Sequence, residues 1–181
     1  MTGKRGKNLF SNLLLRYLVL VIVALPNLFL FYLIFTPLTA YPVFWLLSIL
    51  YDAALLNGNI IIINREVSIE LIRACIAGSA YYLLLILNLT TPKIKLKKRI
   101  HMVLTAFAAF LVLNILRIFF LSIMAISGSS YFDVTHRLFW YLFSTVFVIG
   151  IWFFQVKKYR IKEIPIYSDL KFLFKQSKLK R

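Results

Sequence analysis

Three side chains in this sequence have the chemistry of acyl transfer: a thiol, a guanidinium and an imidazole. Cys75 is the only cysteine among the 181 residues, Arg117 lies in the apolar run "LVLNILRIFF", and His136 follows "FDVT" where the last apolar segment begins. A thiolate can attack a peptide carbonyl, an imidazole can take the thiol proton and return it to the leaving amine, and a fixed cation can stabilise the oxyanion. Together the three residue types predict cleavage through a thioester.

The sequence also predicts four supporting residues, which are Asn114, Gly78, Ser79 and Asp133. The asparagine precedes the arginine by about one helical turn and would lie on the same face. The glycine and the serine follow the cysteine at i+3 and i+4, so one continuous helix would place all three on one face. The aspartate would cap the helix of the histidine or fix the imidazole tautomer.

Each member of the trio also has a structural interpretation. The cysteine in "ACIAGSAYYLLL" fits a stripe of small residues that lets membrane helices pack closely. The arginine would snorkel to the interface or pair with Asp52 or Asp133, because an unpaired one costs at least about 2.5–3.5 kcal/mol on insertion scales. The histidine would be a solvated interfacial side chain. The catalytic interpretation is favoured because three separate segments bring these groups to the same side.

Membrane helices are the elements expected to hold these residues. The chain is 61% hydrophobic and has a mean hydropathy of +0.84, whereas soluble domains average roughly 45–50% apolar residues. In such a chain the net charge of +16 records topology and contact with anionic lipid, not nucleic-acid binding. One cysteine cannot form an internal disulfide or a multi-cysteine metal site, and no cofactor is expected.

The sequence predicts an all-α integral membrane protein, a compact bundle of four to five transmembrane helices at 1–156 with a basic cytoplasmic amphipathic tail at 157–181. A small extracytoplasmic β-hairpin is expected before the cysteine helix, in "NGNIIIINREVSIEL". The apolar segments are near 17–35, 74–90, 102–126 and 137–156, with a shorter one at 40–56.

Clusters of lysine and arginine near the N-terminus, at 93–99 and in the tail from 157 set the expected orientation, because basic segments stay in the cytoplasm. All three can be cytoplasmic only if an even number of crossings precedes 93–99. The segment 40–56 is therefore predicted to be a re-entrant or interfacial helix on the outer side. The alternative is five spans with an outside N-terminus. In both arrangements the trio faces the extracytoplasmic side.

The order and spacing of a hairpin-like stretch, "ACIAGSAYYLLL", "NILRI" and "THRLFW" resemble the exosortase/archaeosortase family of membrane transpeptidases over about residues 40 to 156. The resemblance implies that Cys75, Arg117 and His136 are the family's catalytic residues. Many members have Ser or Thr and then Gly directly after the cysteine, whereas this sequence continues Ile-Ala-Gly. The short chain looks most like an archaeosortase.

The resemblance implies a cysteine protease and transpeptidase of the cell membrane that cleaves the C-terminal sorting signal of secreted proteins. Its substrates would end in a short motif, a transmembrane helix and a basic cluster, and an amine on a membrane lipid would accept the acyl group. Two rival functions stay open. Water could replace the amine, or the protein could be a non-catalytic transporter subunit or lipid-binding scaffold in which Cys75 is dispensable.

Overall fold

The protein is mostly helical, with one small antiparallel sheet. The computed structural model describes residues 2–25, 27–92, 94–139, 142, 144–161, 165–167, 171 and 174. Within them, two helices, α2 and α5, are long and apolar enough to cross a membrane. The elements are α1 (Thr2–Ala24), α2 (Phe29–Ser48), β1 (Ala53–Leu56), β2 (Ile60–Ile63), β3 (Val67–Glu70), α3 (Arg73–Ile76), α4 (Gly78–Leu89), α5 (Leu96–Ile126), α6 (Phe132–Leu138) and α7 (Ser144–Tyr159).

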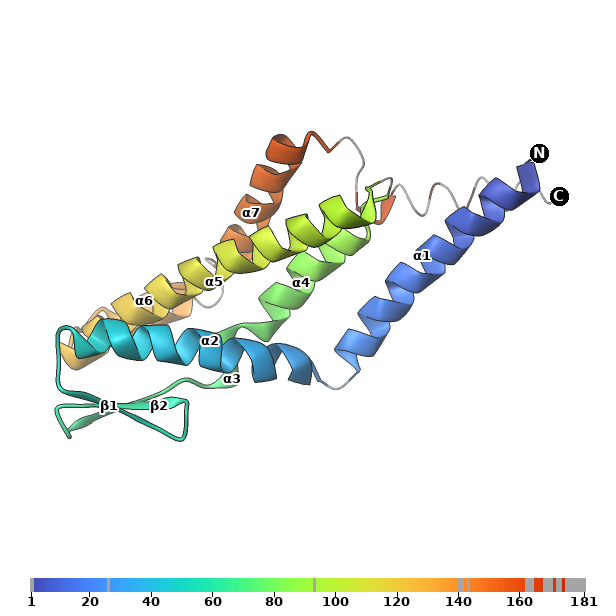
Figure 1. The fold of residues 1–181 in the computed structure, drawn as a ribbon. Coiled ribbons are helices and arrows are strands. Elements are labelled where there is room, and N and C mark those ends of the chain that lie inside the picture. Colours follow the sequence, from blue (N-terminus) through green and yellow to red (C-terminus); the bar gives the residue numbers. More distant parts are fainter. Residues whose placement is uncertain are drawn as a thin grey trace.

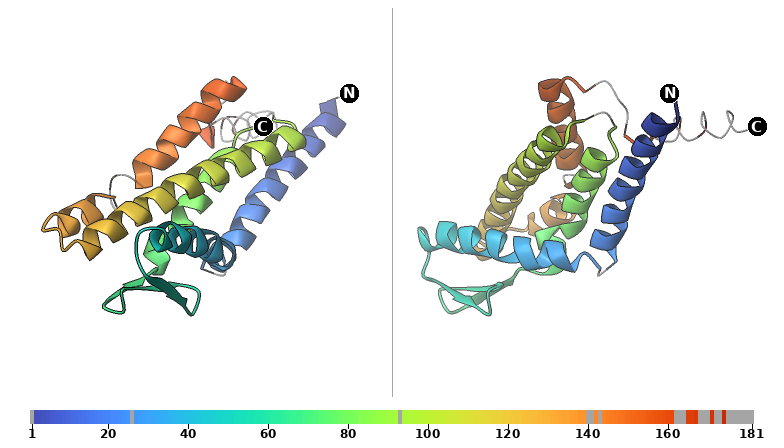
Figure 2. Two further views of the ribbon diagram at one scale, coloured as in Figure 1. Left: turned by 60° about the vertical axis from the view of Figure 1, so that its left-hand side comes forward. Right: turned by 45° about the vertical axis from the view of Figure 1, so that its right-hand side comes forward.

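The helices α1, α4, α5 and α7 run between two ends of the molecule, and α2 lies across one of these ends (Figures 1 and 2). The sheet, α2 and α6 form what we call the sheet end. The opposite end, called the basic end here, holds the start of α1, residues 95–99 and residues 157–160 (Figure 1). The described parts of all three basic clusters therefore lie at the same end. The structure describes four carboxylates, and all four lie at the sheet end. Asp52 directly precedes β1, Glu66 and Glu70 belong to the β2–β3 hairpin, and Asp133 lies in α6.

The predicted hairpin is confirmed as β2 and β3, which pair antiparallel with Ile63 opposite Val67. The turn between them is made by Asn64 and Arg65, whose φ angles of 51° and 61° suit the primed turns of tight hairpins. The strand β1 was not predicted, because its sequence "AALL" has the residues of a helix. It adds to β2 and completes the sheet in the order β1-β2-β3.

The predicted boundaries of the first two apolar segments are wrong. The segment 17–35 is divided, because α1 ends at Ala24 and α2 begins at Phe29. Between the two helices Asn27 and Leu28 adopt φ angles of 48° and 59°, and left-handed residues end a right-handed helix. The segment 40–56 is likewise divided, since α2 continues through two prolines to Ser48 and the chain then enters β1.

Of the remaining predicted helices one is confirmed and two are divided. The segment 74–90 is divided at Ala77 between α3 and α4. The segment 102–126 is confirmed within α5, which begins earlier, at Leu96. The segment 137–156 is divided between α6, which ends at Leu138, and α7, which begins at Ser144. Most of the predicted tail helix lies outside the described residues.

Two arginines hold the basic end of α4. The Arg99 guanidinium is buried and donates hydrogen bonds to the carbonyl oxygens of Asn88, Leu89 and Thr91 at 2.8, 2.5 and 2.9 Å. Arg16 donates to the Leu89 oxygen at 3.0 Å. The last carbonyls of a helix have no partner within it, so these arginines act as a C-terminal cap. These two members of the basic clusters therefore stabilise the end of α4.

Candidate active site

The three predicted catalytic residues line one cavity. Cys75 comes from α3, Arg117 from α5 and His136 from α6, and Ile72, Ala74 and Leu121 complete the lining. The cavity has a volume of about 60 Å³, and a single water needs only about 10–15 Å³ of such space. Three segments that are distant in the sequence thus deliver a thiol, a guanidinium and an imidazole to one small space.

The cysteine lies in a helix of a single turn. After the extended residue Ile72, α3 spans Arg73–Ile76 and ends at Ala77, which has φ 58° and ψ 45°. The prediction that Gly78 and Ser79 share a helical face with Cys75 is wrong, because this left-handed residue separates α3 from α4. Because of this break, the helix that carries the Cys75 side chain does not continue along the axis of α4.

Gly78 and Ser79 have other surroundings than the prediction assumed. Gly78 is buried, and a Cβ atom there would lie 2.9 Å from two ring carbons of Tyr32 in α2. The same ring lies 5.4 Å from the guanidinium carbon of Arg73. Ser79 is exposed. The glycine therefore lets α2 pack closely against the α3–α4 break, and the serine does not line the cavity.

The break leaves two carbonyl groups without the helical amides that would normally follow, and α5 supplies their donors. Asn114 donates from Nδ2 to the carbonyl oxygens of Cys75 and Ile76 at 3.0 and 3.4 Å. Arg117 donates from Nη2 to the Cys75 oxygen at 3.2 Å and from Nη1 to Ser144 Oγ at 2.9 Å. Both side chains are buried, with exposed fractions of 1% and 6%. The structure therefore places the asparagine beside the cysteine, where it supports the backbone and not the arginine.

Arg117 has partners that explain how an arginine is accommodated in an apolar helix. Among the described residues it makes no ion pair with a carboxylate, so the interpretation in which it pairs with Asp52 or Asp133 finds no support. Its Nε is buried and has no hydrogen-bond partner in the part of the chain that the structure describes. Most buried donors in proteins have a partner, so this one calls for an explanation.

Ser144 is a site residue that the sequence reasoning missed. Its hydroxyl accepts from Arg117 and donates to the Phe139 carbonyl oxygen at 3.2 Å, which ties the start of α7 to the end of α6. The available signal was a hydroxyl residue inside the last apolar run, 137–156, because serine is a common first residue of helices. Nothing in the sequence links it to an arginine 27 positions away.

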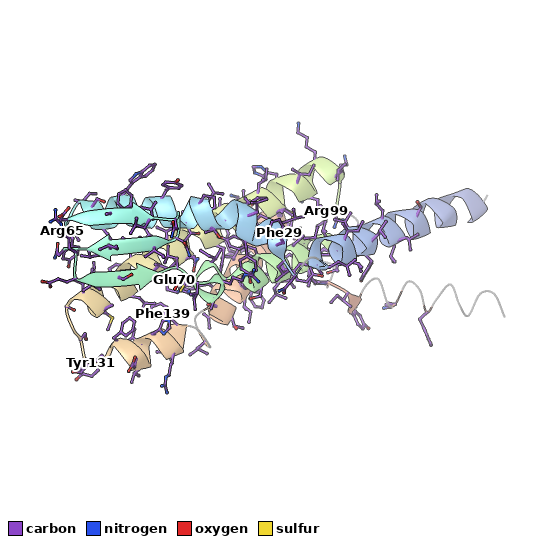
Figure 3. The ribbon with its side chains drawn as sticks, turned by 90° about the horizontal axis from the view of Figure 1, so that it is seen from below. Phe29, Arg65, Glu70, Arg99, Tyr131 and Phe139 are labelled. Atoms are coloured by element: carbon purple, nitrogen blue, oxygen red, sulfur yellow. The ribbon has the colours of Figure 1, made fainter. Side chains whose placement is uncertain are left out.

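His136 is half-buried in α6, and its ring stacks on Phe132 with the centroids 5.5 Å apart and an interplanar angle of 5°. Figure 3 shows α6 at the sheet end, with Tyr131 and Phe139 at its two ends and Arg99 far away at the basic end. Asp133 is exposed, and no hydrogen bond among the described residues joins it to His136. The stacking, and not the aspartate, orients the imidazole.

No group of three metal-ligating side chains occurs among the described residues. The cavity contains a thiol, a guanidinium and an imidazole. No protein-family model, curated protein or solved structure matches the chain.

Proposed function

We propose that this protein is a membrane-embedded cysteine transpeptidase of the archaeosortase type. It cleaves the C-terminal sorting signal of a secreted protein and transfers the new C-terminus to an amine. The observation that supports this proposal is the convergence of Cys75, Arg117 and His136 on one cavity from three separate elements. Chance packing of a lone thiol would not require a buried arginine and a histidine beside it.

In the proposed reaction the Cys75 sulfur attacks the carbonyl carbon of the scissile peptide bond. His136 takes the thiol proton and gives it to the nitrogen of the leaving segment, and the C–N bond breaks to leave a thioester. An incoming amine then attacks the thioester carbonyl, loses a proton to the imidazole and releases the thiol. The acyl group has moved from one nitrogen to another, with no net change of oxidation state.

Arg117 stabilises the oxyanion in both halves of this reaction. Its two terminal nitrogens are held by the Cys75 carbonyl and by Ser144, which fix the guanidinium in place. Its Nε has no partner among the described residues but is buried, so an incoming oxygen reaches this donor only when the substrate displaces the side chains that cover it. The guanidinium as a whole is already held in place, and a donor fixed before the reaction is what makes an oxyanion site effective.

The proposed membrane arrangement has four crossing helices, α1, α4, α5 and α7, with α2 lying across the outer surface. It is supported by the position of all three basic clusters at one end, which the positive-inside rule assigns to the cytoplasm (Figure 1). The cavity then faces the extracytoplasmic side, where a membrane-tethered substrate presents its scissile bond. Reporter fusions at Lys7 and Lys97 should report the same side, and opposite sides would refute this arrangement.

The experiment that tests the function needs a substrate. Proteins of the same genome that share a C-terminal motif, an apolar helix and a basic end are the candidates, and each is coexpressed with the wild-type enzyme or with Cys75→Ala. Cleavage should occur with the wild type only. Mass spectrometry of the product C-terminus separates transfer to an amine, which adds the acceptor mass, from hydrolysis, which leaves a free carboxylate.

Cys75→Ala is a suitable probe because Cys75 is half-buried and unpaired, and alanine is a good helix former. Thermal unfolding of the purified variant in detergent should match the wild type. Full cleavage by a correctly folded Cys75→Ala would remove the nucleophile from the mechanism. A transporter subunit or scaffold would then be the better account.

A further inference from the structure

A second and larger cavity lies between α5 and α7. Its volume is about 390 Å³, within the roughly 300–1,000 Å³ of small-molecule sites. It shares no lining residue with the candidate active site. Its lining includes Ala109, Leu113, Gly150, Phe154, Gln155 and Lys158.

Small residues on both helices leave this groove open. Ala109 of α5 is exposed, and a Cβ atom built on Gly150 of α7 would meet no atom within 4 Å. Leu113 and Phe154 give the groove apolar walls. Small side chains therefore leave the space between α5 and α7 unfilled, and the apolar walls of this space are suited to contact with a hydrocarbon chain.

The length of the groove suits an acyl chain. On α5 it is lined from Thr105 to Leu113 and on α7 from Val146 to Tyr159, which are rises of about 12 and 20 Å at about 1.5 Å per residue. Half of the hydrocarbon core is about 15 Å thick and the whole core is about 30 Å thick. The groove is therefore long enough for a chain from one leaflet and too short for a helix that spans both leaflets.

The polar end of the groove lies at the basic end of the molecule. Lys158 Nζ lies 5.8 Å from the centroid of the Tyr159 ring, and Lys98 Nζ lies 5.5 Å from it. The Tyr159 hydroxyl and Gln155 Oε1 are buried without a hydrogen-bond partner in the described part of the chain. None of the described carboxylates is at this end. Two cations and unsatisfied polar groups thus meet at the mouth of an apolar groove.

We propose that this groove binds an anionic phospholipid from the leaflet at the basic end. One acyl chain lies along α5 and α7, and the phosphate lies against Lys158 and Lys98, because an ammonium is a common partner of phosphate. The site is independent of the proposed catalytic activity, since it shares no lining residue with the candidate active site and its polar end lies at the basic end. It requires only that α5 is in the membrane.

Filling the groove tests the apolar part of the site. Ala108 and Ala109 are neighbours on α5 and are both exposed, but only Ala109 lines the cavity. Full-length protein in detergent is titrated with phosphatidylglycerol and with phosphatidylcholine of the same chains, and bound lipid is counted by native mass spectrometry. Ala109→Leu should lower lipid occupancy, whereas Ala108→Leu should match the wild type. Equal occupancy in the two variants would overturn the proposal.

Removing one charge tests the headgroup. Lys157 and Lys158 are both exposed, and only Lys158 lines the cavity. Lys158→Gln should weaken phosphatidylglycerol binding by about fivefold, which is the effect of one lysine near an anionic surface. It should weaken phosphatidylcholine binding less, because the choline of that lipid offsets the charge of its phosphate. Lys157→Gln is the matched control and should retain wild-type selectivity. Equal binding of the two lipids by the wild type would refute an anionic headgroup site.

A different occupant would give a different result. If the groove held the transmembrane helix of a substrate, Ala109→Leu would reduce substrate cleavage in cells while lipid occupancy stayed at the wild-type level. That result would overturn the lipid proposal. Failure of cleavage in Cys75→Ala has no bearing on lipid occupancy, so the two proposals fail separately.

Discussion

Replacing Arg117 by lysine keeps the charge but removes the planar arrangement of donors on which the proposed site depends. The guanidinium donates to Ser144 Oγ at 2.9 Å and to the Cys75 carbonyl oxygen at 3.2 Å, and its Nε is left for an incoming oxygen. A lysine offers one nitrogen in place of three, on a flexible stem. A lysine can therefore keep at most part of these hydrogen bonds. Its contact with the oxyanion is the one we expect to be lost, because no protein group would hold the lysine nitrogen in position for it.

The expected loss follows from one charge-assisted hydrogen bond, which is about 1.5–3 kcal/mol. At about 1.36 kcal/mol for each factor of ten in rate, Arg117→Lys should process a membrane-tethered substrate about 10- to 150-fold more slowly than the wild type. Ser144→Ala leaves the Cys75 contact and Nε in place, so its loss should be the smaller one. The assay is a time course of substrate cleavage in cells that express each variant at equal level.

Arg137→Lys is the control, because Arg137 is exposed on α6, next to the histidine, and does not line the cavity. It should cleave at the wild-type rate. Arg117→Lys should also unfold within a few degrees of the wild type in detergent, so that a slow rate cannot be assigned to misfolding. Wild-type cleavage by a folded Arg117→Lys would refute the oxyanion role and leave the arginine as a structural donor to the α3–α4 break.

Three further variants have expected outcomes. His136→Ala should slow cleavage by about 100- to 10,000-fold, the usual contribution of a general acid and base, with unchanged stability; a normal rate would exclude the imidazole. Gly78→Ala should lower the free energy of unfolding by about 1–3 kcal/mol, because its Cβ would lie 2.9 Å from the Tyr32 ring, whereas Gly150→Ala, with open space around its Cβ, should not destabilise the protein. Arg99→Met should cost about 1–3 kcal/mol even if only one of its three carbonyl acceptors stays without a donor, and an unchanged thermal midpoint would show that these carbonyls find other partners.

Local sequence signals were sufficient for several elements. The long helix around Arg117 follows from an apolar run far longer than any strand, and the β2–β3 hairpin follows from β-branched runs on either side of Asn64 and Arg65. Both depend on residues that are close in the sequence. The strand β1 could not be predicted in this way, because alanine and leucine favour a helix and only pairing with β2 makes "AALL" extended.

The helix breaks differ in how far the sequence predicts them. Proline is the usual signal for a break, and Pro26 stands in the sequence between the end of α1 and the start of α2. Pro37 and Pro42, however, lie inside α2, and the break at the left-handed residue Ala77 involves no proline. Alanine has the highest helix propensity of all residues, so nothing local predicts that a helix ends at position 77. A break in an apolar environment is stable only if the freed carbonyl groups find donors, and that depends on what packs against them.

The sequence by itself determined the residue types of the candidate site, the apolar segments and the basic clusters, because these depend on composition and on the spacing of a few residues. The tertiary structure decided how those residues are used. Asn114 and Arg117 donate hydrogen bonds to the carbonyl oxygen of Cys75, which lies 39 and 42 positions earlier in the sequence. These bonds stabilise the break after α3, and the thiol of Cys75 lines the same cavity as His136. Hydrogen bonds between side chain and backbone over such separations form only once α5 packs against α3 and α4, and no local pattern specifies that packing.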